Sequence, residues 1–297
     1  MWRILFGLVC LGLLRPVLAQ SAPGNYDQTL RVGGVNRTYS LHLPPAYNGK
    51  RALPLVILLH GRKGNGQVVA RYTQMSAQAD RAGFIVAYPD ALGQPPAWNA
   101  GFNSGKGNGD DERFLSSLLA RLQANLRVDS QRLYIGGHSS GAMMTYRMGA
   151  VLSDQLAAIG VVAGAVGGGR PRRGQTTTIP NPAQPLSVVA FHGQEDNVVP
   201  YNGGRGFLSV ADAMTFWTRA NGCPSRPREN QRGDVRQTRY ADCQRGTEVV
   251  FYTLRDGNHK WPGSTADPND QRQPASQDLN ATQVMWEFFA RHPRSSR

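Results

Sequence analysis

The chain has 297 residues, of which 40% are hydrophobic, so it can bury a sizeable core within one domain. Its formal net charge of +13 favours anionic surroundings such as acidic polysaccharide, a lipid surface or a cell envelope. The basic residues are scattered, apart from runs at 170–173 and 226–239. No helix-turn-helix, zinc-finger or aromatic-interleaved basic motif accompanies them, which argues against nucleic acid as a partner.

The first residues of the chain have the pattern of a secretory signal peptide. A basic start is followed by an apolar run over 4–14, and small or apolar residues up to Ala19 precede the expected cleavage site. The apolar run is too short to span a bilayer, so we expect no stable membrane insertion. The sequence therefore predicts a signal peptide over 1–19 and an exported chain over 20–297, located outside the cell or in the periplasm.

Cleavage would remove Cys10 and leave Cys223 and Cys243. Two cysteines in an exported chain usually form a disulfide, with a pair of free thiols as the alternative. Their spacing does not match C-x-x-C, so we predict a Cys223–Cys243 disulfide and no metal site there.

The predicted elements begin with a β-hairpin. Residues 29–32 and 35–43 alternate apolar and polar side chains around the pair Gly33-Gly34, as the two strands of a hairpin do. The later elements are predicted in this order: a strand over 54–59, a helix over 67–82, a strand over 84–88, a helix over 111–126, a strand from 133 and a helix from 142, strands over 157–163 and 186–191, a helix over 210–220, a strand over 248–254, and a final helix capped by Asn280.

This alternation of apolar strands and helices predicts an α/β fold, a doubly wound, mostly parallel sheet in a single domain. Two segments, 93–109 and 167–185, are polar or rich in glycine and proline and have no period. We expect both to be surface loops. In such a sheet the functional site lies beyond the carboxyl ends of the strands.

Residues 137–141 read Gly-His-Ser-Ser-Gly and fit the pattern G-x-S-x-G. A short apolar strand precedes them and a helix follows, which is the context of a nucleophile elbow. In that turn the serine hydroxyl lies above the sheet edge, and the N–H groups of the new helix point toward the same space. We therefore predict that Ser139 is a nucleophile. In the alternative interpretation, Gly137 and Gly141 are only turn residues.

A serine hydroxyl needs a base to take its proton, and that base needs an acid to orient it. His259 lies in a glycine-bearing loop just after the last predicted strand, from which an imidazole can reach the elbow. We predict that His259 is the base. His60 and His192 each end a buried strand and are predicted to be structural, and His138 should point away from the hydroxyl of Ser139.

The acid is expected after a late strand, where the sequence offers Glu195 and Asp196. The spacing and the following Val-Val-Pro favour Asp196, with Glu195 and Asp256 as alternatives. The resulting order of Ser139, Asp196 and His259 is the order found in α/β-hydrolases.

Two backbone N–H groups are candidates for an oxyanion hole. One belongs to Ser140, directly after the nucleophile, and the other to Arg62, in the turn after an early buried strand. The acidic pair Asp110-Asp111 could suggest a metal or an acid/base pair, but capping of the following helix explains it better.

Taken in order, these segments resemble the secreted polyhydroxybutyrate depolymerase/feruloyl esterase family of α/β-hydrolases. The segments that carry the resemblance are 54–61, 88–90, 98–99, 110–111, 137–144, 192–201, 259–263 and 284–292. The resemblance implies that Ser139, Asp196 and His259 form a catalytic triad and that Arg62 and Ser140 supply the oxyanion hole.

The resemblance further implies substrate contacts at Trp261 and Trp98, with burial in the core as the alternative for each. It also implies a disulfide that steadies the segment before the histidine loop. The chain departs from the family in having Arg62 where members often have cysteine, Asn258 in place of a usual glycine, and an enlarged segment over 167–185.

The resemblance therefore implies a secreted serine carboxylesterase that acts through an acyl-enzyme without a cofactor or metal. We expect its substrates to be feruloyl-type esters of plant polysaccharide, with polyhydroxybutyrate oligomers or acetylxylan as alternatives. A non-catalytic, basic, envelope-binding protein is the competing class. We expect a monomer with no nucleic acid partner.

Overall fold

The computed structural model describes residues 22–102, 110–170, 175–264 and 275–294. The predicted signal peptide, residues 1–19, lies outside the described residues. Within the described ranges, no helix combines the length and the apolar character that crossing a bilayer requires.

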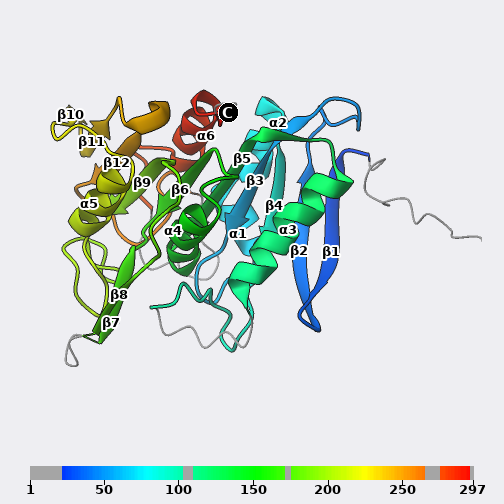
Figure 1. Cartoon of the computed structure of the whole chain (residues 1–297), viewed down its shortest axis with the longest axis horizontal. Coiled ribbons are helices and arrows are strands. Elements are labelled where there is room, and N and C mark those ends of the chain that lie inside the picture. The colour runs from blue at the N-terminus through cyan, green and yellow to red at the C-terminus, as the bar shows by residue number, and fades with distance from the viewer. Residues whose placement is uncertain (1–21, 103–109, 171–174, 265–274, 295–297) are drawn as a thin grey trace, which may run out of the picture.

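A ten-stranded sheet forms the middle layer of the molecule, in the order β1-β2-β4-β3-β5-β6-β9-β12-β11-β10 (Figure 1). The strands from β4 to β12 in that order are parallel, and an antiparallel hairpin extends the sheet at each end. Its strands are β1 (Gly24–Val32), β2 (Val35–Leu43), β3 (Leu53–Leu59), β4 (Ile85–Pro89), β5 (Val128–His138), β6 (Ala158–Val162), β9 (Ser187–Gly193), β10 (Arg228–Arg232), β11 (Val235–Tyr240) and β12 (Val249–Leu254). The predicted α/β fold with a mostly parallel sheet is thus confirmed.

Helices cover both faces of this sheet. An apolar cluster on one face includes Phe114 of α3 and Trp217 of α5, together with residues of α4. A second cluster on the other face includes Tyr72 of α1 and Met285 of α6, together with residues of α2. The helices are α1 (Gly66–Thr73), α2 (Met75–Ala82), α3 (Asp111–Asn125), α4 (Ser140–Val151), α5 (Val210–Ala220) and α6 (Ala281–Arg291).

Strand β3 shows why its sequence is continuously apolar. Successive side chains of a strand point to opposite faces of the sheet. Accordingly Leu55 and Ile57 enter the cluster under α3 to α5, whereas Val56 and Leu58 enter the cluster under α1, α2 and α6. Because helices cover both faces, neither set of positions can be polar.

The helix predicted over 67–82 is divided into α1 and α2. Gln74 adopts a left-handed conformation, with φ of 55°, and its N–H donates to the carbonyl of Ala70 to close α1. The hydroxyl of Thr73 also donates to the carbonyl of Val69, four residues back, which competes with the regular helix pattern. Glutamine carries no sequence signal for a left-handed cap, so the break was not predicted.

The segment 167–185, predicted to be a loop, instead contains a second, two-stranded sheet. Strands β7 (Gly167–Arg170) and β8 (Gln175–Thr178) pair antiparallel. A Cβ atom at Gly168 would lie 2.0 Å from the carbonyl oxygen of Gly206, so only glycine allows this close backbone contact. A strand composed of glycines has no side-chain alternation, and the periodicity analysis therefore missed it.

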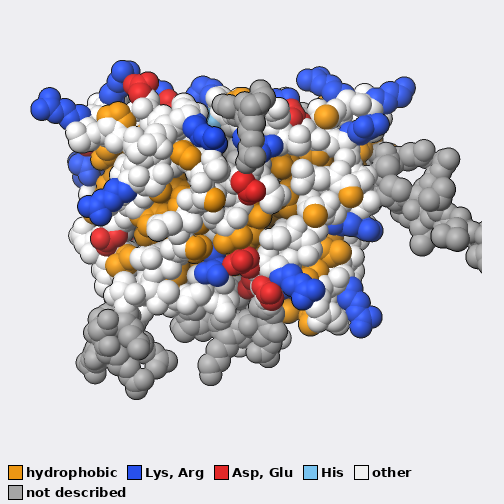
Figure 2. Space-filling view, viewed as in Figure 1, with side chains coloured by type: hydrophobic (Ala, Val, Ile, Leu, Met, Phe, Trp, Pro, Cys, Tyr) orange, Lys and Arg blue, Asp and Glu red, His pale blue; other side chains and the backbone are white. Residues whose placement is uncertain are grey.

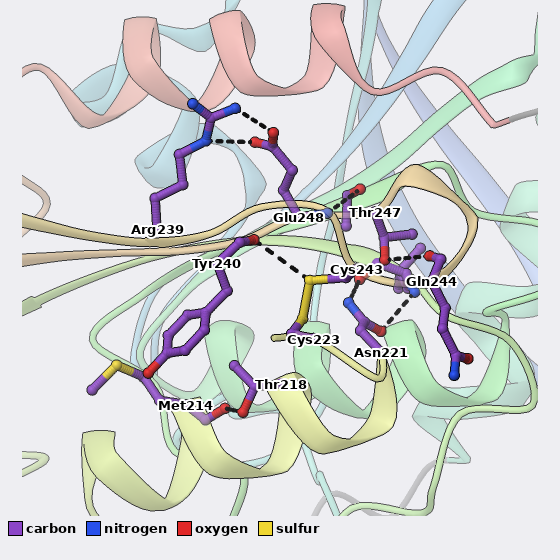
Figure 3. Close-up of a disulfide and its surroundings, with 12 residues drawn as sticks. Met214, Thr218, Asn221, Cys223, Arg239, Tyr240, Cys243, Gln244, Thr247 and Glu248 are labelled. Carbon is purple, nitrogen blue, oxygen red and sulfur yellow. Dashed lines mark hydrogen bonds and ion pairs between the residues drawn. A yellow bond between two sulfur atoms is a disulfide. The ribbon is translucent and has the colours of Figure 1, made fainter. Parts of the chain in front are cut away.

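Cys223 and Cys243 form a disulfide, which confirms the predicted pairing (Figure 3). It joins the chain just after α5 to the chain just after β11, across the hairpin β10–β11 that the sequence analysis did not predict. Beside it the side chain of Asn221 donates to the carbonyl of Leu186 at 2.6 Å and accepts from the N–H of Leu186 at 3.0 Å. The disulfide thus holds together, beside the sheet, the two ends of the segment that contains the β10–β11 hairpin.

We expect the double substitution Cys223→Ser with Cys243→Ser to lower the free energy of unfolding by about 3 kcal/mol, because closing a loop of about 20 residues restricts the unfolded chain by roughly that amount. Urea unfolding followed by circular dichroism measures the change. A reductant should destabilise the unsubstituted chain by a similar amount and leave the double variant unaffected. Coincident urea curves for the two proteins without reductant would contradict the expectation.

Figure 2 shows Lys and Arg side chains spread around the margins of one face, with acidic side chains among them. The distribution agrees with the scattered basic residues of the sequence. On this face no continuous basic surface forms among the described residues.

Candidate active site

Ser139 lies in the turn between β5 and α4. Its φ of 55° and ψ of −118° are strained for a residue other than glycine. Its N–H donates to the carbonyl of Val162 on β6, and its own carbonyl accepts from the N–H of Met143 in the first turn of α4. These bonds hold the sharp strand–turn–helix geometry that the sequence pattern predicted.

The two glycines of the motif are required by close contacts. A Cβ atom at Gly137 would lie 2.5 Å from the carbonyl oxygen of Gly141, and one at Gly141 would lie 2.5 Å from the carbonyl oxygens of Leu59 and His60. The backbone of β3 therefore runs directly against the start of α4. Gly137 and Gly141 are therefore more than turn residues, because their lack of a side chain lets the turn and the neighbouring strand make contact.

His259 and Asp196 reach Ser139 from two other strand ends. The Nε2 atom of His259 lies 2.8 Å from Oγ of Ser139, and its Nδ1 atom lies 2.8 Å from Oδ2 of Asp196. A carboxylate can only accept, so Nδ1 carries the proton and Nε2 is free to accept the serine hydroxyl proton. The three residues follow β5, β9 and β12, whose parallel pairing through β6 brings their carboxyl ends to one edge.

The carboxylate of Asp196 is fully buried and fully hydrogen-bonded. Its Oδ1 atom accepts the N–H groups of Val198 and Val199, each at 2.8 Å. Its Oδ2 atom lies 3.2 Å from Nε2 of His192 in addition to its bond with His259. Burial alone would raise the pKa of Asp196, but the bonds from His192 and His259 outweigh burial and hold that pKa well below its ordinary value.

His192 was predicted to be structural, and the structure shows that it also contacts the acid. Its Nε2–H points to the carbonyl of Val199 at 2.8 Å and to Oδ2 of Asp196 at 3.2 Å, and the residue is 6% exposed. The chain returns on itself between His192 and Val199, and this return places a donor behind the carboxylate. A sequence pattern shows the His-Gly pair but not the direction of its ring.

The loops that carry Asp196 and His259 are joined through glycines. A Cβ atom at Gly193 would lie 2.0 Å from the carbonyl oxygen of Gly257, so the two backbones touch where side chains would stand. The N–H of Glu195 donates to the same carbonyl at 2.9 Å. The acid and the imidazole are therefore positioned as one unit.

His138 is hydrogen-bonded to the loop that carries His259. Its Nε2–H donates to the carbonyl of His259 at 2.7 Å, so its Nδ1 atom must accept from the hydroxyl of Tyr72 at 3.0 Å. Burial and the neighbouring imidazole of His259 lower the pKa of His138 to about 3, so the ring is neutral at neutral pH. Both ring nitrogens bond away from Ser139, as the sequence analysis predicted.

The turn His60-Gly61-Arg62 lies directly against the elbow. A Cβ atom at Gly61 would lie 3.3 Å from Cβ of Ser139. Nε2 of His60 accepts the N–H of Ala91 at 3.0 Å, and its Nδ1 lies 2.7 Å from the Gly61 carbonyl. Between described residues, the N–H groups of Arg62 and Ser140 take part in no hydrogen bond. Two backbone donors, one in the adjacent turn and one directly after Ser139, are thus left without a partner among the described residues.

Residues 37–172 match the family described as Esterase PHB depolymerase. In these residues and in its curated relatives, the chain is similar to the esterase/PHB depolymerase family of α/β-hydrolases. This similarity supports a serine carboxylic ester hydrolase.

Two curated relatives of this esterase family illustrate the similarity. Feruloyl esterase B of Piromyces equi is 29% identical over 239 residues, which cover 75% of this chain and 42% of that protein. Feruloyl esterase C of Emericella nidulans is 27% identical over 266 residues, which cover 85% of this chain and 88% of that protein. The chain thus spans less than half the length of the first relative and most of the second.

Solved structures show the same fold. An acetyl xylan esterase from Aspergillus awamori has a TM-score of 0.61 at 16% identity, covering 90% of this chain and 99% of that one. A ferulic acid esterase from Anaeromyces mucronatus, in complex with ferulic acid, has a TM-score of 0.56 at 16% identity, covering 92% and 91% of the two chains. At these identities the similarity establishes the α/β-hydrolase architecture.

The expectation that Trp261 and Trp98 contact substrate is corrected by their burial. Trp98 is 0% exposed, and its indole N–H donates to the carbonyl of His60, which braces the turn beside the elbow. Trp261 is 1% exposed, and its indole N–H donates to the hydroxyl of Thr282 on α6. Each indole packs in the core and donates its N–H to a neighbouring part of the fold. Both residues therefore stabilise the surroundings of the site and do not face solvent.

The acidic pair beside α3 has two separate structural roles. The carboxylate of Asp110 accepts the N–H of Arg113 and caps the helix, as predicted. The carboxylate of Asp111 instead forms a buried ion pair with Arg37 at 2.8 Å and accepts the N–H of Asn99 at 3.0 Å. Among the described residues, no group of histidine, cysteine and acidic side chains is arranged to hold a metal ion.

Proposed function

We propose that the chain is a carboxylesterase in which Ser139, His259 and Asp196 form the catalytic triad. The continuous chain of two 2.8 Å hydrogen bonds from hydroxyl to imidazole to buried carboxylate carries this proposal. It converts a poor nucleophile into an activated one, because the imidazole is held in the tautomer that accepts the serine proton.

In the proposed reaction, Oγ of Ser139 attacks the ester carbonyl while Nε2 of His259 takes the hydroxyl proton. The N–H groups of Arg62 and Ser140 stabilise the oxyanion of the tetrahedral intermediate. When that intermediate collapses, His259 returns the proton to the leaving alcohol and an acyl-enzyme remains. Water then attacks the acyl carbonyl while His259 takes its proton, and His259 returns that proton to Oγ of Ser139 as the bond to the acyl group breaks and the acid leaves. The anionic Asp196 stabilises the imidazolium in both halves.

We further propose that the acyl group is aromatic, of the feruloyl type. A small apolar cluster of Ala100, Met143, Ala165 and Val199 packs beside the elbow, with Phe102 and Phe207 partly buried against it. Met143 lies one helical turn after the nucleophile, and Val199 donates its N–H to the acid. An apolar floor with phenylalanine rings suits an aromatic acyl chain better than an acetyl group. The similarity to feruloyl esterases supports the same choice.

A comparison of ester substrates tests this assignment. We expect kcat/KM to be higher for methyl ferulate than for acetylated xylan or hydroxybutyrate oligomers, measured by release of the free acid. A preference for either alternative would contradict the feruloyl assignment and leave the esterase assignment standing. Failure to hydrolyse p-nitrophenyl acetate as well would contradict the triad and favour the non-catalytic, envelope-binding alternative.

We also propose that the chain is exported after cleavage near Ala19. The signal pattern of residues 1–19 and the Cys223–Cys243 disulfide both support it, because disulfides persist mainly in oxidising compartments. N-terminal sequencing of the protein recovered from outside the cytoplasm should begin at or near Gln20.

We expect His192 to be a positioning residue for Asp196. Replacing His192 by leucine removes the donor to Oδ2 and should lower kcat roughly 10- to 100-fold, since a hydrogen bond to a charged group contributes about 1.5–3 kcal/mol. KM should stay nearly constant because the ring is buried behind the acid. Loss of the donor raises the pKa of Asp196, so the acidic limb of the pH–rate profile should move to higher pH.

The variant His192→Gln keeps a donor near the same position and should restore most of kcat and the original pH profile. A merely structural role for His192 would lower the melting temperature of both variants without moving the acidic limb. Such a result would remove His192 from the positioning network.

A further inference from the structure

A cavity of about 320 Å³ lies at the opposite edge of the sheet from the triad. Its walls come from the turn after α4, from the residues that lead into β9 and β12, and from the end of α6. These segments meet the amino ends of β6, β9 and β12, whereas Ser139, Asp196 and His259 follow the carboxyl ends of β5, β9 and β12. A ligand in this cavity would therefore not meet the triad.

Three arginines from separate parts of the chain converge on this cavity: Arg245 before β12, Arg291 in the last turn of α6, and Arg294 just after it. The guanidinium of Arg245 donates to the amide oxygen of Gln184, and Nη1 of Arg294 donates to the carbonyl of Asp154. Within the described residues, none of the three guanidinium groups has a carboxylate partner.

Glu248 interacts with the charge of Arg291 but does not line the cavity, and its carboxylate is engaged elsewhere. Glu248, directly before β12, binds Arg239 through both carboxylate oxygens (Figure 3). One of those oxygens also lies 3.4 Å from Nε2 of His292. Of the described residues that line the cavity, one is acidic, Asp154. Burial lowers the pKa of His292, whose Nδ1–H donates to the carbonyl of Phe288, so this residue forms a neutral wall. The cavity thus keeps a net positive charge.

Like charges held close together in a concave surface repel one another unless an anion joins them. The planar fork of an arginine matches the two oxygens of a carboxylate or a phosphate, and such bonds are stronger than those between neutral groups. We propose that this cavity is a binding site for a small ligand that carries an oxyanion, either a carboxylate or a phosphate group. The volume would admit a ligand about the size of one charged sugar.

Calorimetric titration at low ionic strength with inorganic phosphate, galacturonate and glucose tests the proposal. We expect at least one anion to bind and the neutral sugar not to bind. Binding of galacturonate alone would identify a saccharide carboxylate as the ligand, and binding of phosphate alone would identify a phosphate ligand. Either result supports the site. Absence of binding by both anions would overturn it.

The double variant Arg245→Gln with Arg291→Gln should raise the Kd of the bound anion at least tenfold. Both side chains are exposed, so the fold should survive, and thermal melting checks this. The matched control is Arg228→Gln with Arg232→Gln, which removes the same charge from the exposed strand β10. An equal loss of affinity in the control would show that only the overall charge attracts the anion and would overturn the proposal.

The esterase reaction offers an independent readout. Saturating anion should leave hydrolysis of p-nitrophenyl acetate unchanged, and both double variants should turn over at the rate of the unsubstituted chain. Competitive inhibition by the anion would place it at the triad and contradict the distal site. Failure of the esterase proposal would leave the calorimetric result intact, since binding at this edge involves none of the triad residues.

Discussion

Replacing Ser139 by alanine is expected to lower esterase turnover by a factor on the order of 10⁶. The substitution removes the atom that attacks the ester and leaves His259 with no hydroxyl to deprotonate. Hydrolysis of p-nitrophenyl acetate measures the change. The substitution removes no hydrogen bond that holds the turn. The bonds of residue 139 to Val162 and Met143 involve only its backbone N–H and carbonyl groups, which alanine keeps.

An exposed serine provides the control for this prediction. Ser225, in the loop after Cys223, is exposed and far along the chain from the elbow, so Ser225→Ala should retain the full rate. If the Ser139 variant kept nearly the rate of the unsubstituted chain, with a melting temperature like that of the control, another group would have to perform the attack.

Replacing Asp196 by asparagine is expected to lower kcat on the order of 10⁴-fold. An amide can turn its NH₂ group toward Nδ1 of His259, which would then have to accept and would leave the proton on Nε2. In that tautomer the imidazole cannot take the proton of Ser139. The amide oxygen can still accept the N–H groups of Val198 and Val199, so the loop should keep its shape.

Glu195 is the matched control for the acid. It is the neighbouring acidic residue that the sequence left as an alternative, and its side chain is exposed. Glu195→Gln should change kcat less than twofold. A large loss in this variant together with a small loss in Asp196→Asn would reverse the assignment of the acid.

The sequence predicted most of the parallel sheet because its strands are buried on both faces and read as continuous apolar runs. Strand β10 could not be found in this way. All of its residues are exposed, so neither face of the strand carries an apolar pattern. Its pairing with β11 depends on the turn and on the disulfide that closes the excursion, which are features of the folded chain.

The three triad candidates were predicted individually because each follows a recognisable strand end. The contacts that fix their geometry were harder to predict. The bond between His192 and Asp196 depends on a loop that folds back on itself, and the ion pair between Arg37 and Asp111 joins residues 74 positions apart. The roles of Trp98 and Trp261 were misjudged because an aromatic residue in a loop has the same signature whether it faces a ligand or the interior.

The contact between Gly193 and Gly257 has a consequence for changing the specificity of this enzyme. Because the backbones that bear the acid and the imidazole touch there, a bulkier residue at either position would separate both from the nucleophile together. The walls around Phe102 and Phe207 belong to other loops and carry no part of that contact. Redesign of the proposed acyl site can therefore vary the residues around Phe102 and Phe207, provided that the glycine pair is left untouched.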